Sequence, residues 1–196
     1  MNFEYLVEIA GIRHRSAHPD DVVPHGPPYF AKLRRENLPE ITEKVREEGM
    51  TSVGFVNIML ASNDLHVDIP RHDIAGWYEF LDNAGVLKPI DRLARHEPGS
   101  LILRNYSSAE DPGHMAFIYS RIPILRSYIA HCYGFNTMST KLDKPGVTLE
   151  EFINSDDWHP EGTYTHVCEW ADLKRVAHGV EHSIFEQEEE ASSGCF

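Results

Sequence analysis

Apolar residues in the first half of the chain recur with the spacing of α-helices. Residues 38–49 begin with Pro39 next to the start, carry acidic residues in the first turn and end at Gly49, which predicts a helix. The next segment, 51–63, is apolar around nearly its whole circumference, so we expect a helix that is buried on most sides. A third helix is predicted over 72–85, where Asn-Ala-Gly forms a C-terminal stop.

The second half of the chain is made largely of short apolar runs of strand length. Their boundaries of glycine, proline and serine predict strands over 99–106, 113–120, 124–133 and 162–170. A loose alternation predicts another strand over 3–12, the proline-rich stretch 15–29 predicts an extended loop, and a capping box at the start of 148–158 predicts a helix. Helices followed by antiparallel strands indicate an α+β fold, with the buried helix packed on the sheet.

Length and composition indicate one ordinary globular domain. The chain has 196 residues, of which 41% are hydrophobic and 25% are charged. We expect a single domain over 1–196, with a core at about 38–170, an N-terminal extension at 1–37 and an acidic C-terminal tail at 180–196. The three cysteines form no CxxC pair, so neither a disulfide framework nor a zinc ribbon is expected.

The formal net charge of −13 narrows the range of partners. Such a charge repels phosphate backbones, so nucleic acid is not expected as a partner. No apolar run is long enough to span a bilayer, and no basic region precedes an apolar signal core at the N-terminus. We therefore expect no membrane contact and a cytoplasmic location by default, with export by another route left open.

Two histidines and one serine form the candidate chemical group. An antiparallel hairpin that pairs Tyr119 with Arg126 would set His114 opposite His131 on one face of the sheet. The buried helix, packed across that face, would bring Ser52 at its N-terminus to His114. This order supplies a nucleophile, a base and a group that orients the base, and the helix N-terminus would stabilise an oxyanion.

The order of these segments resembles the NlpC/P60 family of papain-like cysteine peptidases, which cleave amide bonds in bacterial cell-wall peptides. The family's Asp-Cys-Ser-Gly helix start, Pro-Gly-Asp-Leu strand, Gly-His-Val strand and later strand ending in a polar residue have counterparts here. These are "TSVGFVNIML", "EPGSLIL", "DPGHMAFIYS" and "SYIAHC". The resemblance covers about residues 48–133 and implies a papain-like core, an acyl-enzyme mechanism, no cofactor and a peptide or muropeptide-like substrate.

The resemblance also implies a role for each site residue. Position 52 would attack the carbonyl, His114 would take and return the proton, and His131 would hold the imidazole in the right tautomer. The backbone N–H of residue 52 or 53 would bind the oxyanion. Contacts to the substrate are expected at Tyr29, Thr51, Val53 and Gly113, although a packing role for the tyrosine is an alternative.

The chain departs from the family at the nucleophile. Ser52 stands where the family has cysteine, and Thr51 stands where it has aspartate. A cysteine thiol, with a pKa near ~8.5 that falls further beside His⁺ and a helix N-terminus, gives a ready thiolate, whereas a serine must lose its proton during attack. Three explanations are open: an engineered replacement, a natural serine nucleophile, or a non-catalytic relative that binds peptide. We favour the first, with catalysis by the cysteine form.

Other interpretations stay open beside this one. Taken singly, Ser52 is more often a helix cap than a nucleophile, and His114 more often a hydrogen-bonded core residue than a base. The same cleft could transfer an acyl group to an amine instead of to water. Residues 66–73, "HVDIPRHD", offer ligand types that zinc accepts and suggest a metal-dependent hydrolase. Their spacing fits no compact motif, so no metal is expected.

Overall fold

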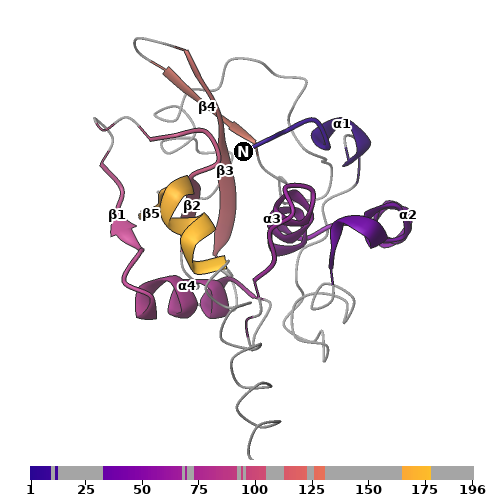
Figure 1. Cartoon of the computed structure of the whole chain (residues 1–196), viewed down its shortest axis with the longest axis horizontal. Helices are drawn as coiled ribbons and strands as arrows, with labels where there is room; N and C mark the ends of the chain where they lie inside the picture. The colour runs from indigo at the N-terminus through magenta and orange to yellow at the C-terminus, as the bar shows by residue number, and fades with distance from the viewer. Residues whose placement is uncertain are drawn as a thin grey trace, which may run out of the picture.

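Helices and an antiparallel sheet make up the described part of the chain, which confirms the α+β prediction (Figure 1). The structure is a computed structural model that describes the following residues: 1–9, 12, 33–67, 69, 73–91, 94, 96–104, 113–122, 126–130 and 165–177, without the side chains of 119–122 and 126–130. The predicted loop 15–29, helix 148–158 and tail 180–196 lie outside these residues.

The predicted helices of the first half are present. The helical elements are α1 at Leu6–Ile9, the short 3-10 helix η2 at Arg35–Asn37, α2 at Leu38–Glu48, α3 at Ser52–Ala61 and α4 at Ile74–Asn83, and residues 170–177 are also helical. The helices α2, α3 and α4 confirm the predictions over 38–49, 51–63 and 72–85. None of the helices in the described ranges combines the length and the apolarity that crossing a bilayer requires.

The strand predicted over 3–12 is wrong, because the structure has α1 there. Leu6 and Ile9 are both buried, and their spacing of three residues places them on one side of a helical turn. The alternation along this segment is short, and packing of these two side chains onto the core selects the helical period over the period of two.

The sheet has five strands in the order β1-β5-β2-β3-β4, and every neighbouring pair is antiparallel. The strands are β1 at Lys88–Pro89, β2 at Leu101–Arg104, β3 at His114–Ile122, β4 at Arg126–Ala130 and β5 at His166–Cys168. Four of them confirm the predicted strands. The sequence did not predict β1, because it is only two residues long and includes a proline, which is confined to edges and ends of sheets.

The predicted register of the β3–β4 hairpin is wrong. Arg126 pairs with Ile122 rather than with Tyr119, so the pairing begins closer to the turn. A register shift between Ile118 and Ser120 then adds one residue on the β3 side, as in a β-bulge. The register that would set His114 opposite His131 is therefore not the observed one, and His131 itself lies outside the described residues.

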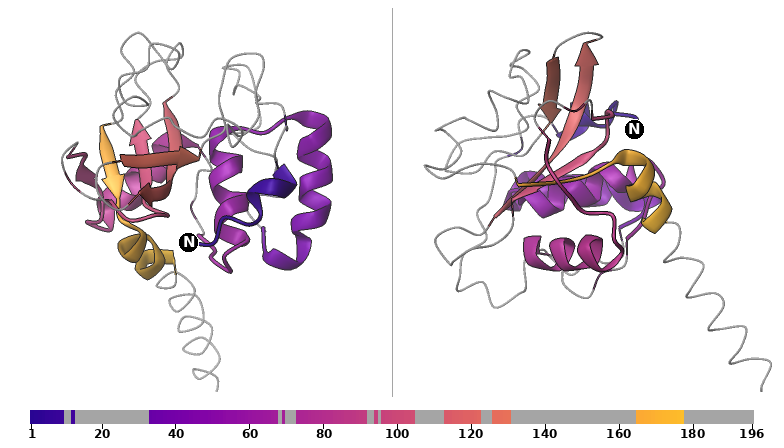
Figure 2. Two further views of the ribbon diagram at one scale, coloured as in Figure 1. Left: turned by 90° about the horizontal axis from the view of Figure 1, so that it is seen from above. Right: turned by 90° about the vertical axis from the view of Figure 1, so that its left-hand side faces the viewer.

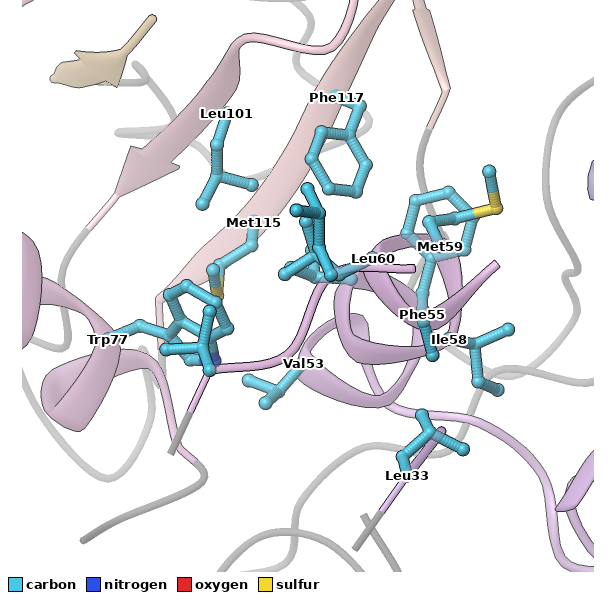
Figure 3. Close-up of a cluster of buried hydrophobic side chains, with 14 of the residues drawn as sticks. Leu33, Val53, Phe55, Ile58, Met59, Leu60, Trp77, Leu101, Met115 and Phe117 are labelled. Atoms are coloured by element: carbon cyan, nitrogen blue, oxygen red, sulfur yellow. The ribbon is translucent and has the colours of Figure 1, made fainter. Parts of the chain in front are cut away.

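The helix α3 lies at the centre of the molecule, between the sheet and α2 (Figure 2). All ten of its residues are buried, which explains why its sequence is apolar on every side. It packs against β3, and the ring of Phe55 lies 6.1 Å from the ring of Phe117, centroid to centroid. Figure 3 shows these side chains together with Met115 of β3 and Trp77 of α4.

Candidate functional site

Two neighbouring hydroxyl residues at the start of α3 have different roles. Thr51 is the N-cap, with extended backbone, and its Oγ1 accepts a hydrogen bond from the backbone N–H of Gly54 at 3.0 Å. Ser52 follows as the first residue of the helix and is 7% exposed. Because Thr51 already caps the helix, the capping explanation for Ser52 does not hold.

The same helix end leaves hydrogen-bond donors available. The N–H of Gly54 is bonded to the Thr51 hydroxyl and that of Phe55 to the Thr51 carbonyl. Within the described ranges, no hydrogen bond involves the backbone N–H of Ser52 or Val53. These amides lie at the positive end of the helix dipole, and no acidic side chain occupies the first turn. An oxygen that carries negative charge would be stabilised there.

His114 is the first residue of β3 and is buried, with 4% of its surface exposed. Gly113 precedes it with a φ of 78°, in the region that side chains rarely adopt, and this turns the chain into the strand. Across the sheet His114 pairs with Arg104, which is also buried. Two polar side chains with positive or titratable groups therefore lie next to each other at this end of β2 and β3.

Strand alternation decides which face of the sheet each β3 residue occupies. Met115 and Phe117 belong to the hydrophobic cluster that includes α3. His114 and Ala116 occupy the alternate positions, on the other face. The prediction that α3 packs across the face of the sheet that carries His114 is therefore wrong, and this packing does not by itself bring the imidazole to Ser52. A contact between them requires the imidazole to reach around the end of the strand, where His114 is the terminal residue.

The remaining predicted substrate residues divide into two groups. Val53 is 4% exposed and its side chain belongs to the hydrophobic cluster, so its backbone is the part that could contact a ligand. Gly113 is partly exposed beside His114. Tyr29 lies outside the described residues, as His131 does.

The described members of segment 66–73 have structural roles. Asp73 is the N-cap of α4, and its Oδ1 accepts a hydrogen bond from the N–H of Gly76 at 2.6 Å. His66 Nδ1 lies 2.5 Å from Nη1 of Arg34. Among the residues that the structure describes, no three His, Cys, Asp or Glu side chains are grouped as a metal site. Asp68 and His72 are not among them.

A partly buried polar network that the sequence did not predict joins two distant segments, 91–100 and 169–170. His96 Nδ1 lies 2.7 Å from Glu169 Oε1, and its Nε2 lies 3.0 Å from the carbonyl O of Asp91. The Ser100 hydroxyl donates to Glu169 Oε2 at 2.7 Å and accepts from the N–H of Trp170. These partners are 69 to 73 positions apart, and no local pattern marks their contact.

The environment of Glu169 shifts its acidity. Burial alone would raise the pKa of this carboxyl, but hydrogen bonds from His96 and Ser100, the charge of His96 and the N–H of Glu97 together hold the pKa below its ordinary value. The Ser100 hydroxyl donates a hydrogen bond to a carboxylate that is already ionised. We therefore interpret Ser100 as a structural link between the two segments and not as a nucleophile.

A second unpredicted contact joins α4 to β5. The Tyr78 hydroxyl lies 3.3 Å from Nε2 of His166, and the two rings meet edge to face at 5.0 Å. The Thr165 hydroxyl lies 2.7 Å from Nδ1 of the same histidine. Both ring nitrogens of His166 are thus engaged, which fixes the orientation of the ring.

Comparison with known proteins gives no relative from which a function could be transferred. No family model matches the chain. No curated protein matches it. No solved structure matches it either.

Proposed function

We propose that this chain is an amide hydrolase of the NlpC/P60 type, with a papain-like core, whose nucleophile position is 52. The observation that carries the proposal is the start of α3: Thr51 supplies the cap, which leaves Ser52 and two backbone N–H groups for chemistry. The helix packs on β3, the strand that begins with His114 directly after Gly113. A nucleophile at a helix N-terminus and a histidine at the start of the neighbouring strand are the two parts that acyl transfer needs.

The mechanism assigns each bond change to a group. With cysteine at position 52, the thiolate attacks the carbonyl carbon, and the carbonyl electron pair moves onto oxygen. The N–H groups of residues 52 and 53 stabilise this oxyanion. As the tetrahedral intermediate collapses, the C–N bond breaks and the His114 imidazolium protonates the leaving amine. Water, deprotonated by His114, then attacks the thioester and releases a carboxylic acid and the thiol.

The proposed substrates are cell-wall-like peptides with isopeptide bonds or D-amino acids, which follow from the resemblance in segments 48–133. His131 is the proposed orienting residue. Transfer of the acyl group to an amine on the same cleft is a variant of this function, and it differs only in which nucleophile attacks the thioester.

A peptide-binding protein without chemistry is the second candidate, and the serine at position 52 favours it. A site shaped for a thiolate and an imidazolium is nearly inactive with a hydroxyl, because serine is far less acidic than cysteine. The same donors at the start of α3 would then hold a peptide carbonyl without cleaving the bond. Calorimetric titration of the Ser52 chain with cell-wall peptides measures this binding directly.

The test of the hydrolase restores cysteine with Ser52→Cys in the full chain and follows a panel of muropeptides by mass spectrometry. We expect cleavage and an acyl-enzyme adduct on position 52, and added hydroxylamine should divert the acyl group if an amine is an acceptor. The matched controls are Ser52→Ala, which should be inert, and Ser52→Cys with His114→Asn, which should lose roughly a hundredfold or more in kcat. Neither turnover nor adduct in Ser52→Cys across the panel would overturn the proposal.

A further inference from the structure

Two histidines in the described part of the chain have ring nitrogens whose partners are compatible with a neutral imidazole. His66 Nδ1 lies 2.5 Å from Nη1 of Arg34, which can only donate, so this nitrogen accepts. His166 lies between the hydroxyls of Tyr78 and Thr165, and a hydroxyl can either donate or accept. A neutral imidazole, with one donor nitrogen and one acceptor nitrogen, therefore satisfies both arrangements.

His96 differs because both of its ring nitrogens face acceptors. Nδ1 lies 2.7 Å from Oε1 of Glu169, and Nε2 lies 3.0 Å from the carbonyl oxygen of Asp91. The pKa of Glu169 is held below its ordinary value against the effect of burial, so its carboxyl group is ionised and can only accept. A neutral imidazole has one N–H and could bond to only one of these two oxygens. Only the imidazolium form donates to both.

The surroundings of the His96 ring favour the charged form. The ring is 3% exposed, so water has almost no access to a nitrogen that is left without its proton. The charged side chain that is paired with it in the described ranges is the Glu169 carboxylate. Asp91 and Glu97, on the same segment as the ring, are acidic as well. A negative neighbour stabilises a positive ring, and a bare ring nitrogen would instead face an oxygen lone pair.

The turn that follows His96 connects this ion pair to the sheet. The N–H of Gly99 donates to the carbonyl oxygen of Ile118 at 2.7 Å, and the N–H of Ile118 donates to the carbonyl oxygen of Ser100 at 2.9 Å. Ile118 belongs to β3, and Glu169 directly precedes the last described helix. The contact between His96 and Glu169 therefore joins the turn, β3 and that helix.

We propose that His96 is a buried imidazolium that holds this turn to Glu169, and that loss of its proton at alkaline pH weakens the connection, as a pH-sensitive latch. The native state then binds more protons than the unfolded state near neutral pH, so the stability that His96 contributes falls as the pH rises. The contribution is fully present below about pH 6.5, where a free histidine is also protonated, and is lost above it as the folded ring gives up its proton. This inference does not depend on the proposed function.

The direct test is NMR spectroscopy of the full chain with ¹⁵N-labelled histidine, with the ring signals assigned through bonds to the backbone. At about pH 7.5 roughly nine-tenths of free histidine side chains are neutral. We expect His96 to show the two protonated nitrogens of an imidazolium at this pH. The matched control is His166, which should show one protonated and one bare nitrogen. A bare ring nitrogen on His96 at pH 7.5 would overturn the inference.

A second measurement tests the effect on stability. Urea midpoints of the parent and of His96→Gln are compared from about pH 6 to about pH 9. Glutamine carries no charge at any pH, so the parent should be the more stable protein at the lower pH, and most of this difference should disappear at the higher pH. For His166→Gln, the difference from the parent should not shrink as the pH rises. A difference between parent and His96→Gln that stays constant over the range overturns the latch.

Hydrogen exchange in the parent gives the same test if His96→Gln does not fold. The reporters are the amide of Gly99, bonded to Ile118, and the amide of Trp170, bonded to the Ser100 hydroxyl. After correction for the intrinsic effect of pH, their protection should fall between about pH 6 and about pH 9 relative to the amide of Trp77 in α4. Protection that falls equally at all three amides, or at none, overturns the latch.

Discussion

Thr51 and Ser52 have different roles because they lie one position apart at the start of α3, which changes the backbone groups that each hydroxyl can reach. Thr51 lies just before α3 with extended backbone, and its hydroxyl turns back to the N–H of Gly54. Ser52 is already helical, and a residue inside the first turn no longer has that geometry. The hydroxyl of Ser52, the candidate nucleophile from the sequence, is thus the one that does not cap the helix.

Burial likewise decides the chemistry of Cys168 at the residue scale. Burial, as the main cause, and the nearby carboxylates of Asp172 and Glu169 together raise the pKa of this thiol to about 12. At a pH of about 8 only on the order of one thiol in ten thousand would be ionised. The thiolate is the reactive species, so this cysteine is chemically inert in the native protein.

We therefore predict that iodoacetamide alkylates Cys168 far more slowly in the native protein than in concentrated guanidinium chloride at the same pH. Peptide mapping by mass spectrometry after timed quenching measures both rates. Equal rates would contradict the burial of the thiol. The denatured sample serves as the control, because it shows that the peptide is detectable and that the reagent is active.

At the scale of the element, α3 gains stability from its cap, because the Thr51 hydroxyl satisfies the N–H of Gly54, which has no carbonyl partner within the helix. We predict that Thr51→Val, which keeps the shape and removes the acceptor, lowers the free energy of unfolding by about 1 kcal/mol. Thr51→Ser retains the oxygen and should recover most of the loss. Urea denaturation measures all three proteins. Equal stability of Thr51 and Thr51→Val would show that the bond to Gly54 does not contribute.

The β3–β4 hairpin shows what an element cannot specify on its own. The alternation of side chains predicts two strands and is the same for any register that differs by two residues. The shift between Ile118 and Ser120 adds a residue without leaving a mark in the pattern. The pairing of distant positions in a hairpin therefore has to come from the structure.

At the scale of the whole molecule, Glu169 holds separate segments together. Its carboxylate joins His96 and Ser100, on the segment that leads into β2, to the start of helical residues 170–177. Gly99, in the same turn, has a φ of 95°, and a Cβ there would meet Trp170 at 2.9 Å. The turn and the helix are thus fitted closely to each other.

This arrangement predicts an acid-dependent stability. The pKa of Glu169 in the folded protein is lowered below the 4.5 of a free side chain, so the native state binds fewer protons than the unfolded state. Its contribution is present above about pH 4.5 and is lost as the pH falls through the folded pKa. Glu169→Gln should therefore be less stable than the parent at neutral pH, and the difference should shrink on acidification. Urea midpoints across this range test it.

The matched control for Glu169 is Glu47→Gln, on the exposed side of α2. This change should leave the urea midpoint almost unaltered at neutral pH and should leave the acid dependence as it is in the parent. A gap between parent and Glu169→Gln that stays constant from neutral to acidic pH would contradict the role of the ionised carboxylate.

Much of the fold follows from patterns within a dozen residues. The all-round apolar segment at 51–63 predicts a central buried helix, and the short apolar runs predict β2, β3, β4 and β5, because burial of neighbouring side chains imposes the period of each element. The wrong strand prediction over 3–12 also comes from a local pattern, because the alternation there is short enough to fit both the strand period and the helix period.

The sequence alone determined which segments form helices and strands and which residue types could carry chemistry, because those depend on neighbours in the chain. The tertiary structure decided that Thr51 is the cap, that His114 and Phe117 lie on opposite faces of the sheet, and that Glu169 joins His96 and Ser100. These depend on contacts between segments far apart in sequence, whose energies no local spacing encodes.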